Sequence, residues 1–303
     1  MTDAPGATRS TRLGAADRRR LRAALLAWYK PRSRPLRIRM TKDPWAILVA
    51  EVMAQQTQIG RVDVAWPRFM AMYPTAASLA GAPTGEVLRA WAGLGYNRRA
   101  VALQRTAQVV LAEHSGRVPS EVEALLALPG IGPYTARAVA AVAFGQPVAA
   151  VDTNVRRVVK RLLGRPTSAA DLQATADELV DPVDPPAWTH ATMDLGATVC
   201  RPRRPLCDDC PISRWCASAG IVEEPLRIAR AAAAAPFERT SRWLRGRIVA
   251  HLRGLDGGAW TRLPSEIGSH GPEAVAAAVT GLERDGLLER RPDGAVRLPS
   301  TPT

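Results

Sequence analysis

Helical periodicity dominates the chain from Asp43 to about Leu163, and no convincing strand interrupts it. Apolar residues recur there every three or four positions, which is the spacing of amphipathic helices. Helix starts are marked by capping residues, as at Asp43 before Pro44 and at Asp152 before Thr153. A long run of capped helices predicts an all-α core.

The charge balance limits the partners that such a core can have. Lys+Arg number 41 against 28 Asp+Glu, so the formal net charge is +13, and nearly all the basic residues are Arg. This balance predicts a polyanionic partner, either a nucleic acid or an anionic membrane surface. We expect no secretory signal, because Met1–Arg20 lacks an apolar segment. We also expect no membrane span, because charged and proline residues break the longest apolar stretch, Ala136–Val151.

Composition shifts divide the chain into segments. Residues 1–17 are expected to form a disordered tail, and 18–223 a helical core that opens with a helix over Arg18–Lys30. An Ala run indicates a linker over 224–238. The remaining residues, 239–303, are expected to form a separate C-terminal module.

The C-terminal module has the pattern of a small α+β domain. Helices are expected over Thr240–Leu252, Pro264–Ser269 and Pro272–Arg284. Two short alternating runs then flank Asp293-Gly294, which is a hairpin signal. This order predicts a winged-helix-like module that binds duplex DNA or a partner, or that merely caps the structure.

A carboxylate lies on the apolar stripe of the helix expected over Trp45–Thr57. Glu51 follows Ile47 by four residues and Leu48 by three, so the three side chains share a face. Burial raises the pKa of a carboxyl group, and an acid still protonated near neutral pH can serve as a general acid. The alternative is a structural Glu paired with an Arg.

A glycine-rich string, LPGIGPYT, joins two helical segments at Leu128–Thr135. Gly130 and Gly132 allow a tight turn whose backbone N–H groups lie beside a helix N-terminus, which suits a phosphate. This pattern is typical of a helix-hairpin-helix that binds the DNA backbone. One helix later, Asp152 is placed to stabilise a developing cation, with a simple N-cap as the alternative.

All four cysteines fall within a short segment, with the spacing Cys200-x6-Cys207-x2-Cys210-x5-Cys216. Clustering of this kind indicates a metal site in a reducing compartment rather than a disulfide framework. The uneven spacing favours a [4Fe-4S] cluster over zinc. Between the first two cysteines a basic loop can contact phosphates through Arg201, Arg203 and Arg204, unless it is only a solvated charge run.

Together, the hairpin, the acidic helix cap and the cysteine spacing resemble the endonuclease III superfamily of DNA glycosylases. The motif EVMAQQT, which contains Glu51, and the motif GLGY at Gly93–Tyr96 are similar to the adenine glycosylase branch, MutY. The resemblance covers about residues 20–220. It implies a six-helix barrel (about 43–150) packed on a domain made of the N-terminal helix and 151–223, which holds the [4Fe-4S] cluster, with a DNA cleft between them.

The resemblance also implies roles for individual residues. Glu51 matches the acid that protonates the adenine ring, and Asp152 matches the carboxylate that stabilises the sugar oxocarbenium ion, with Asn154 as its polar neighbour. Tyr134 replaces the Lys with which bifunctional relatives form a Schiff base, so we expect weak or absent lyase activity. Gln56, Leu94 and Tyr96 match residues that fill the stack and contact the base opposite the excised one. Gly130 and Gly132 match the hairpin that binds DNA, and Thr57 is expected to contact DNA as well.

Three base-pocket positions depart from the family pattern, while Arg39 is retained. Ile38 replaces an aromatic residue, Ala54 replaces a Leu, and His190 lies where many members have Gln or Glu. The C-terminal module is also too short for the NUDIX-like domain that recognises 8-oxoguanine in this branch. These departures concern the identity of the excised base more than the type of reaction.

The sequence therefore predicts a monofunctional DNA glycosylase that removes adenine mispaired with guanine or 8-oxoguanine. Its expected partner is mismatched double-stranded DNA, without a membrane, and we expect a monomer in the cytoplasm, associated with the nucleoid. One alternative is a thymine or uracil mismatch glycosylase of the same superfamily. The other is a non-catalytic iron–sulfur regulator that binds DNA through the C-terminal module.

Overall fold

The structure is a computed structural model that describes residues 13–221, 236–255 and 258–302. The chain forms two compact units. We call Met1–Pro35 with Ala140–Leu226 the cysteine unit, and Leu36–Val139 with Arg227–Thr303 the hairpin unit. In the described ranges, every helix is too short or too polar to cross a membrane. Most of the expected tail (1–17) and linker (224–238) lies outside the described residues.

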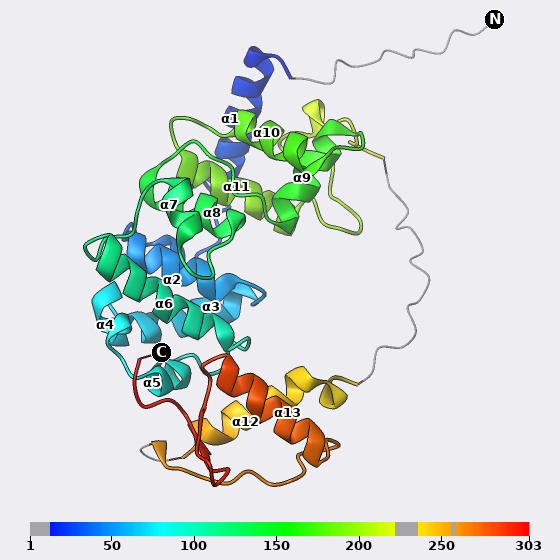
Figure 1. The fold of residues 1–303 in the computed structure, drawn as a ribbon. Coiled ribbons are helices and arrows are strands. Elements are labelled where there is room, and N and C mark those ends of the chain that lie inside the picture. Colours follow the sequence, from blue (N-terminus) through cyan, green and yellow to red (C-terminus); the bar gives the residue numbers. More distant parts are fainter. Residues whose placement is uncertain (1–12, 222–235, 256–257, 303) are drawn as a thin grey trace, which may run out of the picture. The chain divides into compact units, whose positions relative to one another are not determined.

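The cysteine unit is helical, as the sequence predicts. Its helices are α1 (Ala15–Tyr29), α9 (Thr153–Leu163), α10 (Ala169–Leu179) and α11 (Pro185–Thr198), followed by a short 3-10 helix, η2 (Ser213–Trp215) (Figure 1). α11 packs against both α1 and α9, and their buried apolar faces form one core with α10. The first helix begins at Ala15, three residues before the expected start, because Gly14 adopts the extended conformation of an N-cap.

The hairpin unit begins with η1 (Arg37–Arg39), a short 3-10 helix, and with helices that surround a second core. Their side chains with no exposed surface include Leu48, Met53 and Trp91. The bounds of these helices are α2 (Pro44–Ala54), α3 (Ile59–Met72), α4 (Ala76–Ala80), α5 (Thr84–Ala90), α6 (Arg98–Glu113), α7 (Val122–Ala127) and α8 (Pro133–Phe144). The last residues of α8, from Ala140, are counted with the cysteine unit.

The second helix, α2, starts as expected and ends early. The Asp43 carboxylate accepts hydrogen bonds from the backbone N–H groups of Trp45 (3.1 Å) and Ala46 (3.3 Å), with Pro44 in the first turn. The helix ends at Ala54 rather than Thr57. It stops there because the next residue turns to extended backbone and Gln56 has a left-handed φ of 54°.

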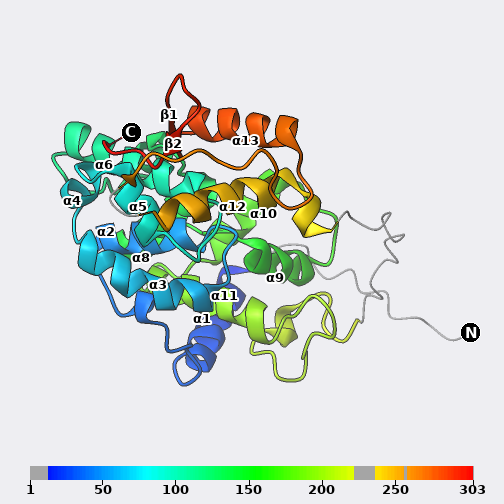
Figure 2. The ribbon, with the colours of Figure 1, turned by 90° about the horizontal axis from the view of Figure 1, so that it is seen from below.

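The C-terminal module has two helices and a hairpin, and its third expected helix is absent. η3 (Phe237–Arg239) precedes α12 (Ser241–Arg253), which packs on α13 (Pro272–Arg284) (Figure 1). The strands β1 (Glu289–Arg290) and β2 (Val296–Arg297) form an antiparallel pair around Asp293-Gly294, beside α13 in Figure 2. This pair confirms the hairpin prediction.

The helix expected over Pro264–Ser269 is wrong. Ile267 and His270 instead exchange two backbone hydrogen bonds of 3.0 and 3.1 Å across a tight turn. Gly268 makes the turn with a φ of 63°, and a Cβ there would lie 2.7 Å from the Trp243 ring. A left-handed residue pressed against a ring favours a turn over a helix.

The C-terminal end of the chain is joined to helix α5 of the same unit. The backbone N–H of Gly85 donates to the Pro299 carbonyl (2.8 Å), and that of Thr84 donates to the Thr301 carbonyl (3.2 Å). First-turn N–H groups have no partner within their own helix, so the returning chain satisfies them. The module is therefore an integral part of the hairpin unit.

Replacement of Gly85 by Ala should loosen this junction. The new Cβ would lie 2.8 Å from the Pro299 carbonyl oxygen and 3.0 Å from the Leu298 Cβ. Such overpacking costs about 1–3 kcal/mol of unfolding free energy, measurable by urea denaturation. Gly60→Ala is the matched control, because Gly60 is also the second residue of its helix and a Cβ there meets nothing within 4 Å. Equal stability of the two variants would contradict the proposed clash.

Candidate active site and DNA-binding surface

Glu51 lies on the most deeply buried helix of the hairpin unit. Ile47 and Leu48, which share its face, are 3% and 0% exposed, while Glu51 itself is half-buried. The side chain is thus largely withdrawn from water, and its Oε2 is fully buried. This is the placement that a general acid needs.

Arg99, at the start of α6, binds the end of the Glu51 helix. Its guanidinium donates to the carbonyls of Val52 (2.9 Å) and Met53 (2.8 Å), which are among the last in α2. It also donates to the Leu94 and Gly95 carbonyls (3.0 and 3.1 Å). Burial lowers the pKa of Arg99 to about 10, so the side chain remains a cation at neutral pH.

Arg99 therefore joins the Glu51 helix to the loop expected to contact DNA. Its guanidinium also donates to the Thr57 hydroxyl (2.9 Å), which lies 3.3 Å from the Leu94 carbonyl. Sequence reasoning missed this residue, because a side chain that binds distant carbonyls leaves no local pattern. The one available signal is its position, directly after the turn that ends the GLGY motif.

Two of the expected DNA-contacting residues have strained backbones. Gln56 has a φ of 54° and Tyr96 a φ of 46°, both in the left-handed region that non-glycine residues rarely adopt. Both side chains are exposed, whereas Leu94 between their loops is only 5% exposed. Strain of this kind concentrates at functional sites, where surrounding contacts hold it in place.

The glycine-rich string forms a turn between α7 and α8. Gly130 has a φ of 74°, and a Cβ there would lie 2.8 Å from the Ala102 Cβ of α6. The Gln55 side chain, which directly follows α2, donates to the Gly130 carbonyl (3.4 Å) and the Thr135 hydroxyl (3.2 Å). Gln55 thereby connects the Glu51 helix to the hairpin.

The remaining positions that sequence places near the base belong to both units. In the hairpin unit, Ile38, Arg39, Ala54 and Tyr134 are all half-buried, and Tyr134 lies in the first turn of α8. His190 is half-buried on α11 of the cysteine unit.

Asp152 is the N-cap of α9 in the cysteine unit. Its Oδ1 accepts the Val155 backbone N–H (2.6 Å), and its Oδ2 accepts the Asn154 side-chain amide (2.9 Å). Both carboxylate oxygens are thus oriented by hydrogen-bond donors. A carboxylate that caps a helix can also stabilise a cation, so one role does not exclude the other.

Arg157 extends this arrangement toward the cysteines. Its guanidinium donates to the Asn154 side-chain oxygen (2.9 Å) and to the carbonyls of Gly196 (2.6 Å) and Cys200 (2.7 Å). Gly196 is necessary there, because a Cβ would lie 2.6 Å from the Asn154 Cβ. Sequence analysis did not assign Arg157 a role, since its two carbonyl partners, Gly196 and Cys200, lie about 40 residues away along the chain.

The four cysteines are half-buried and form no disulfide. The pKa of the Cys210 thiol is raised to about 11, chiefly by burial and in part by the neighbouring thiols of Cys200, Cys216 and Cys207. Within the described ranges no three His, Cys, Asp or Glu side chains converge closely enough to form a metal-binding group. The thiols are nevertheless within electrostatic reach of one another.

The basic loop between the first two cysteines is held from α9. The Arg161 guanidinium donates to the carbonyls of Arg201 (2.8 Å) and Pro202 (3.1 Å) and to the Cys200 sulfur (3.4 Å). Arg201, Arg203 and Arg204 are all exposed. The loop can therefore present its arginines to phosphates without losing its anchor.

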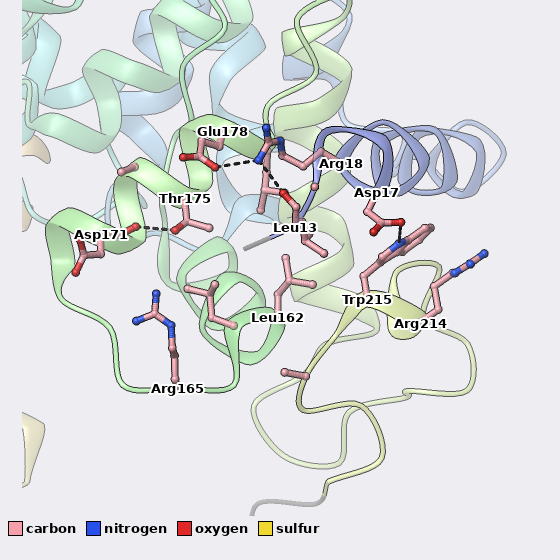
Figure 3. A pocket seen from close by; sticks show the side chains of 15 residues that line it. Leu13, Asp17, Arg18, Leu162, Arg165, Asp171, Thr175, Glu178, Arg214 and Trp215 are labelled. Atoms are coloured by element: carbon pink, nitrogen blue, oxygen red, sulfur yellow. Dashed lines mark hydrogen bonds and ion pairs between the residues drawn. The ribbon is translucent and has the colours of Figure 1, made fainter. Parts of the chain in front are cut away.

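A cavity of about 440 Å³ lies elsewhere in the cysteine unit. Figure 3 shows Trp215 beside Asp17, which accepts the indole N–H at 3.3 Å, and Arg18 reaching Glu178 at 3.3 Å. None of the residues expected to act on a base lines this cavity. It is therefore separate from the candidate site.

Comparisons with known proteins agree with these features. A family described as the HhH-GPD superfamily of base excision DNA repair proteins matches residues 49–185. The adenine DNA glycosylase of Mycolicibacterium smegmatis is 40% identical over 284 residues, which cover 90% of this chain and 94% of that relative.

Two solved structures are similar over 67% of this chain and 96% of their own. A thermostable thymine-DNA glycosylase matches with a TM-score of 0.63 and 31% identity, and an endonuclease III–DNA complex with 0.57 and 26%. These matches confirm the expected helical fold. The chain is a DNA glycosylase, and it belongs to the adenine DNA glycosylase branch of the HhH-GPD superfamily.

Proposed function

We propose that this enzyme hydrolyses the N-glycosidic bond of adenine mispaired with guanine or 8-oxoguanine in double-stranded DNA. The observation that carries the proposal is Glu51, a half-buried acid on a helix bound to both DNA-contacting loops by Arg99 and Gln55. The similarity to an adenine glycosylase over 90% of the chain supports the choice of base.

The proposed mechanism divides the work between two carboxyl groups. Glu51 donates a proton to the adenine ring, so that the base leaves as a neutral molecule. Asp152, oriented by the Val155 N–H and the Asn154 amide, stabilises the cationic sugar until water attacks. This is the two-carboxylate logic of glycoside hydrolysis. The base must first leave the stack to be reached.

We further propose that the enzyme is monofunctional. A lyase reaction needs an amine that attacks the sugar carbon, and the only lysines are Lys30, Lys42 and Lys160. None lies in the hairpin, where Tyr134 follows the turn. Hydrolysis by water therefore leaves an intact strand with an abasic site.

A panel of four duplexes tests both which base the enzyme excises and whether it acts by hydrolysis alone. Wild-type enzyme should release free base from A:8-oxoguanine and A:G duplexes and none from T:G or U:G. Borohydride added during the reaction should trap no covalent adduct, and strands should break only after alkali. Release of thymine or uracil alone, or an efficiently trapped adduct, would overturn the proposal.

A second candidate function is removal of thymine or uracil from mismatches. Two observations favour it: a thymine-DNA glycosylase has a similar structure, and Ile38, Ala54 and His190 depart from the adenine-branch pattern. The thymine-DNA glycosylase is 31% identical to this chain, which is less than the 40% identity of the adenine DNA glycosylase. Its match also covers a smaller share of this chain, 67% against 90%. We therefore place this function second. A non-catalytic regulator does not fit a chain that belongs to the glycosylases.

We propose that the four cysteines bind a [4Fe-4S] cluster. All four thiols are half-buried, form no disulfide and interact electrostatically with one another. Burial raises the pKa of Cys210 and Cys216, and binding to a cationic iron–sulfur core would offset the unfavourable ionisation of these thiols. When bound, the cluster would supply a rigid anchor for the basic loop and, through the Arg157 contact at Cys200, for the Asp152 helix.

Substitution of Cys210 by Ser should therefore lower both the cluster content and the thermal stability. We expect loss of most bound iron and sulfide and a fall in melting temperature of at least about 5 °C, because metal binding stabilises the folded state. Iron and sulfide assays with calorimetry measure both effects. Ser213→Ala, in the same segment, is the control. Full iron content in Cys210→Ser would refute the ligand assignment.

We also propose that the enzyme acts as a monomer on chromosomal DNA in the nucleoid. The net charge of +13 favours binding to a polyanion. Solved structures with this fold include an endonuclease III–DNA complex. Sedimentation with and without a mismatched duplex tests the stoichiometry, which should be one chain per duplex.

A further inference from the structure

A groove of about 670 Å³ opens within the hairpin unit between the Tyr96 loop and helix α12. One wall carries Gln56 and Tyr96, the two strained residues expected to face the DNA opposite the excised base. Phe237, Arg242 and Trp243 of the C-terminal module line the other wall. Residues from two distant parts of the sequence thus enclose one space.

The lining of the groove is cationic. Five arginines line it and, in the part of the chain that the structure describes, no Asp or Glu does. Asp285, outside the lining, pairs with Arg98 (3.6 Å) and Arg245, and backbone carbonyls hold Arg99. Arg242 and Arg247 remain without an ion-pair partner among the described residues. Arg99 is held in place by its carbonyl partners, so the unpaired cations that are free to bind a ligand are Arg242 and Arg247 of α12.

The same arginines lie over aromatic rings. The Arg242 guanidinium carbon is 4.2 Å from the centroid of the Tyr96 ring and 5.4 Å from that of Phe237. Arg247 lies 5.9 Å from the centroid of one ring of Trp243. Aromatic and guanidinium planes beside free cationic charge are the features that bind an unstacked nucleotide by its base and its phosphate.

We propose that this groove holds one unstacked nucleotide of the strand opposite the excised base. Its base stacks on the outer face of the Arg242–Tyr96 pair, and Arg247 binds its phosphate. The identity of the strand rests on the proposed function, with Gln56 and Tyr96 as the residues expected to contact the opposite base. The C-terminal module thereby becomes part of substrate recognition, with Arg242 as a positioning residue.

Binding to a duplex with no base to excise tests the groove independently of catalysis. The probe carries a tetrahydrofuran abasic analogue opposite guanine, and fluorescence anisotropy at fixed salt gives the Kd. Arg242→Ala should weaken binding about tenfold, the usual effect of losing one stacking partner. Arg291→Ala is the control, because Arg291 also lies over an aromatic ring of this module, Trp260 at 4.1 Å, outside the groove. Equal Kd values for the two variants would overturn the proposal.

A spectroscopic measurement separates stacking from a structural role. With 2-aminopurine opposite the analogue, wild-type enzyme should change its fluorescence on binding, and Arg242→Ala should reduce that change. Arg242→Lys should recover part of the affinity without recovering the signal, because an ammonium group carries charge without a flat stacking plane. Recovery of the full signal by Lys would contradict stacking.

The phosphate contact has its own measurement. Arg247→Ala should reduce the slope of log Kd against log salt by about one unit, as expected for one lost phosphate contact. An unchanged slope would remove Arg247 from the groove site.

If wild type releases no adenine while Arg242→Ala binds the abasic duplex more weakly than Arg291→Ala, the proposed function fails and the groove remains. If wild type releases adenine while Arg242→Ala and Arg291→Ala bind equally well, the groove fails and the proposed function remains.

Discussion

Replacement of Glu51 by Gln should lower the single-turnover rate of adenine release by about a thousandfold. General acid catalysis contributes a hundredfold to ten-thousandfold, and an amide of the same shape has no proton to donate. The half-buried position on α2 should accommodate the isosteric side chain without repacking. Chromatography of free adenine from an A:8-oxoguanine duplex, with enzyme in excess, measures the rate.

Binding should survive this substitution, which separates the loss of chemistry from a loss of affinity. The Kd for a duplex with a tetrahydrofuran site opposite guanine should change by less than about threefold. Glu113→Gln, an exposed glutamate at the end of α6, serves as the control and should release adenine at the wild-type rate. A wild-type rate in Glu51→Gln would remove Glu51 from the mechanism.

Replacement of Asp152 by Asn should slow adenine release by about a hundredfold to a thousandfold. Removal of one preorganised electrostatic partner of a transition state has an effect of this size. Asn caps a helix about as well as Asp, so the hydrogen bond to the Val155 N–H can persist and the fold should remain stable. The change therefore removes charge more than structure.

The chain offers a matched control for this second prediction. Asp184 is the N-cap of α11 in the same unit, where its carboxylate accepts the Ala187 N–H at 3.0 Å. Asp184→Asn should change neither the rate nor the melting temperature appreciably. If both variants release adenine equally fast, Asp152 acts only as a helix cap.

Local signals in the sequence predicted local structure well. The caps at Asp43 and Asp152 and the hairpin at Asp293-Gly294 depend on neighbouring residues alone, and the structure confirms all three. The helix expected over Pro264–Ser269 failed because Gly268 is pressed against Trp243, a contact that no local pattern records.

The side-chain contacts that link the elements around the candidate site could not be predicted from the sequence, for a related reason. Arg99 and Arg157 bind backbone carbonyls, which every residue possesses, so no residue type marks their partners. The stacking of Arg242 on Tyr96 likewise depends on how the C-terminal module packs within the hairpin unit. Motifs pointed to the residues with proposed chemical roles, whereas only the fold identified the residues that hold them in place.

The central claim is that Glu51 and Asp152 together release adenine from mismatched DNA. Free base released in a single turnover from an A:8-oxoguanine duplex tests it most directly, with wild type and a Glu51→Gln/Asp152→Asn double variant side by side. Wild type should release adenine stoichiometrically, and the double variant should release none above the uncatalysed background while it still binds the abasic duplex. Adenine release by the double variant, or release of another base by wild type, would contradict the account.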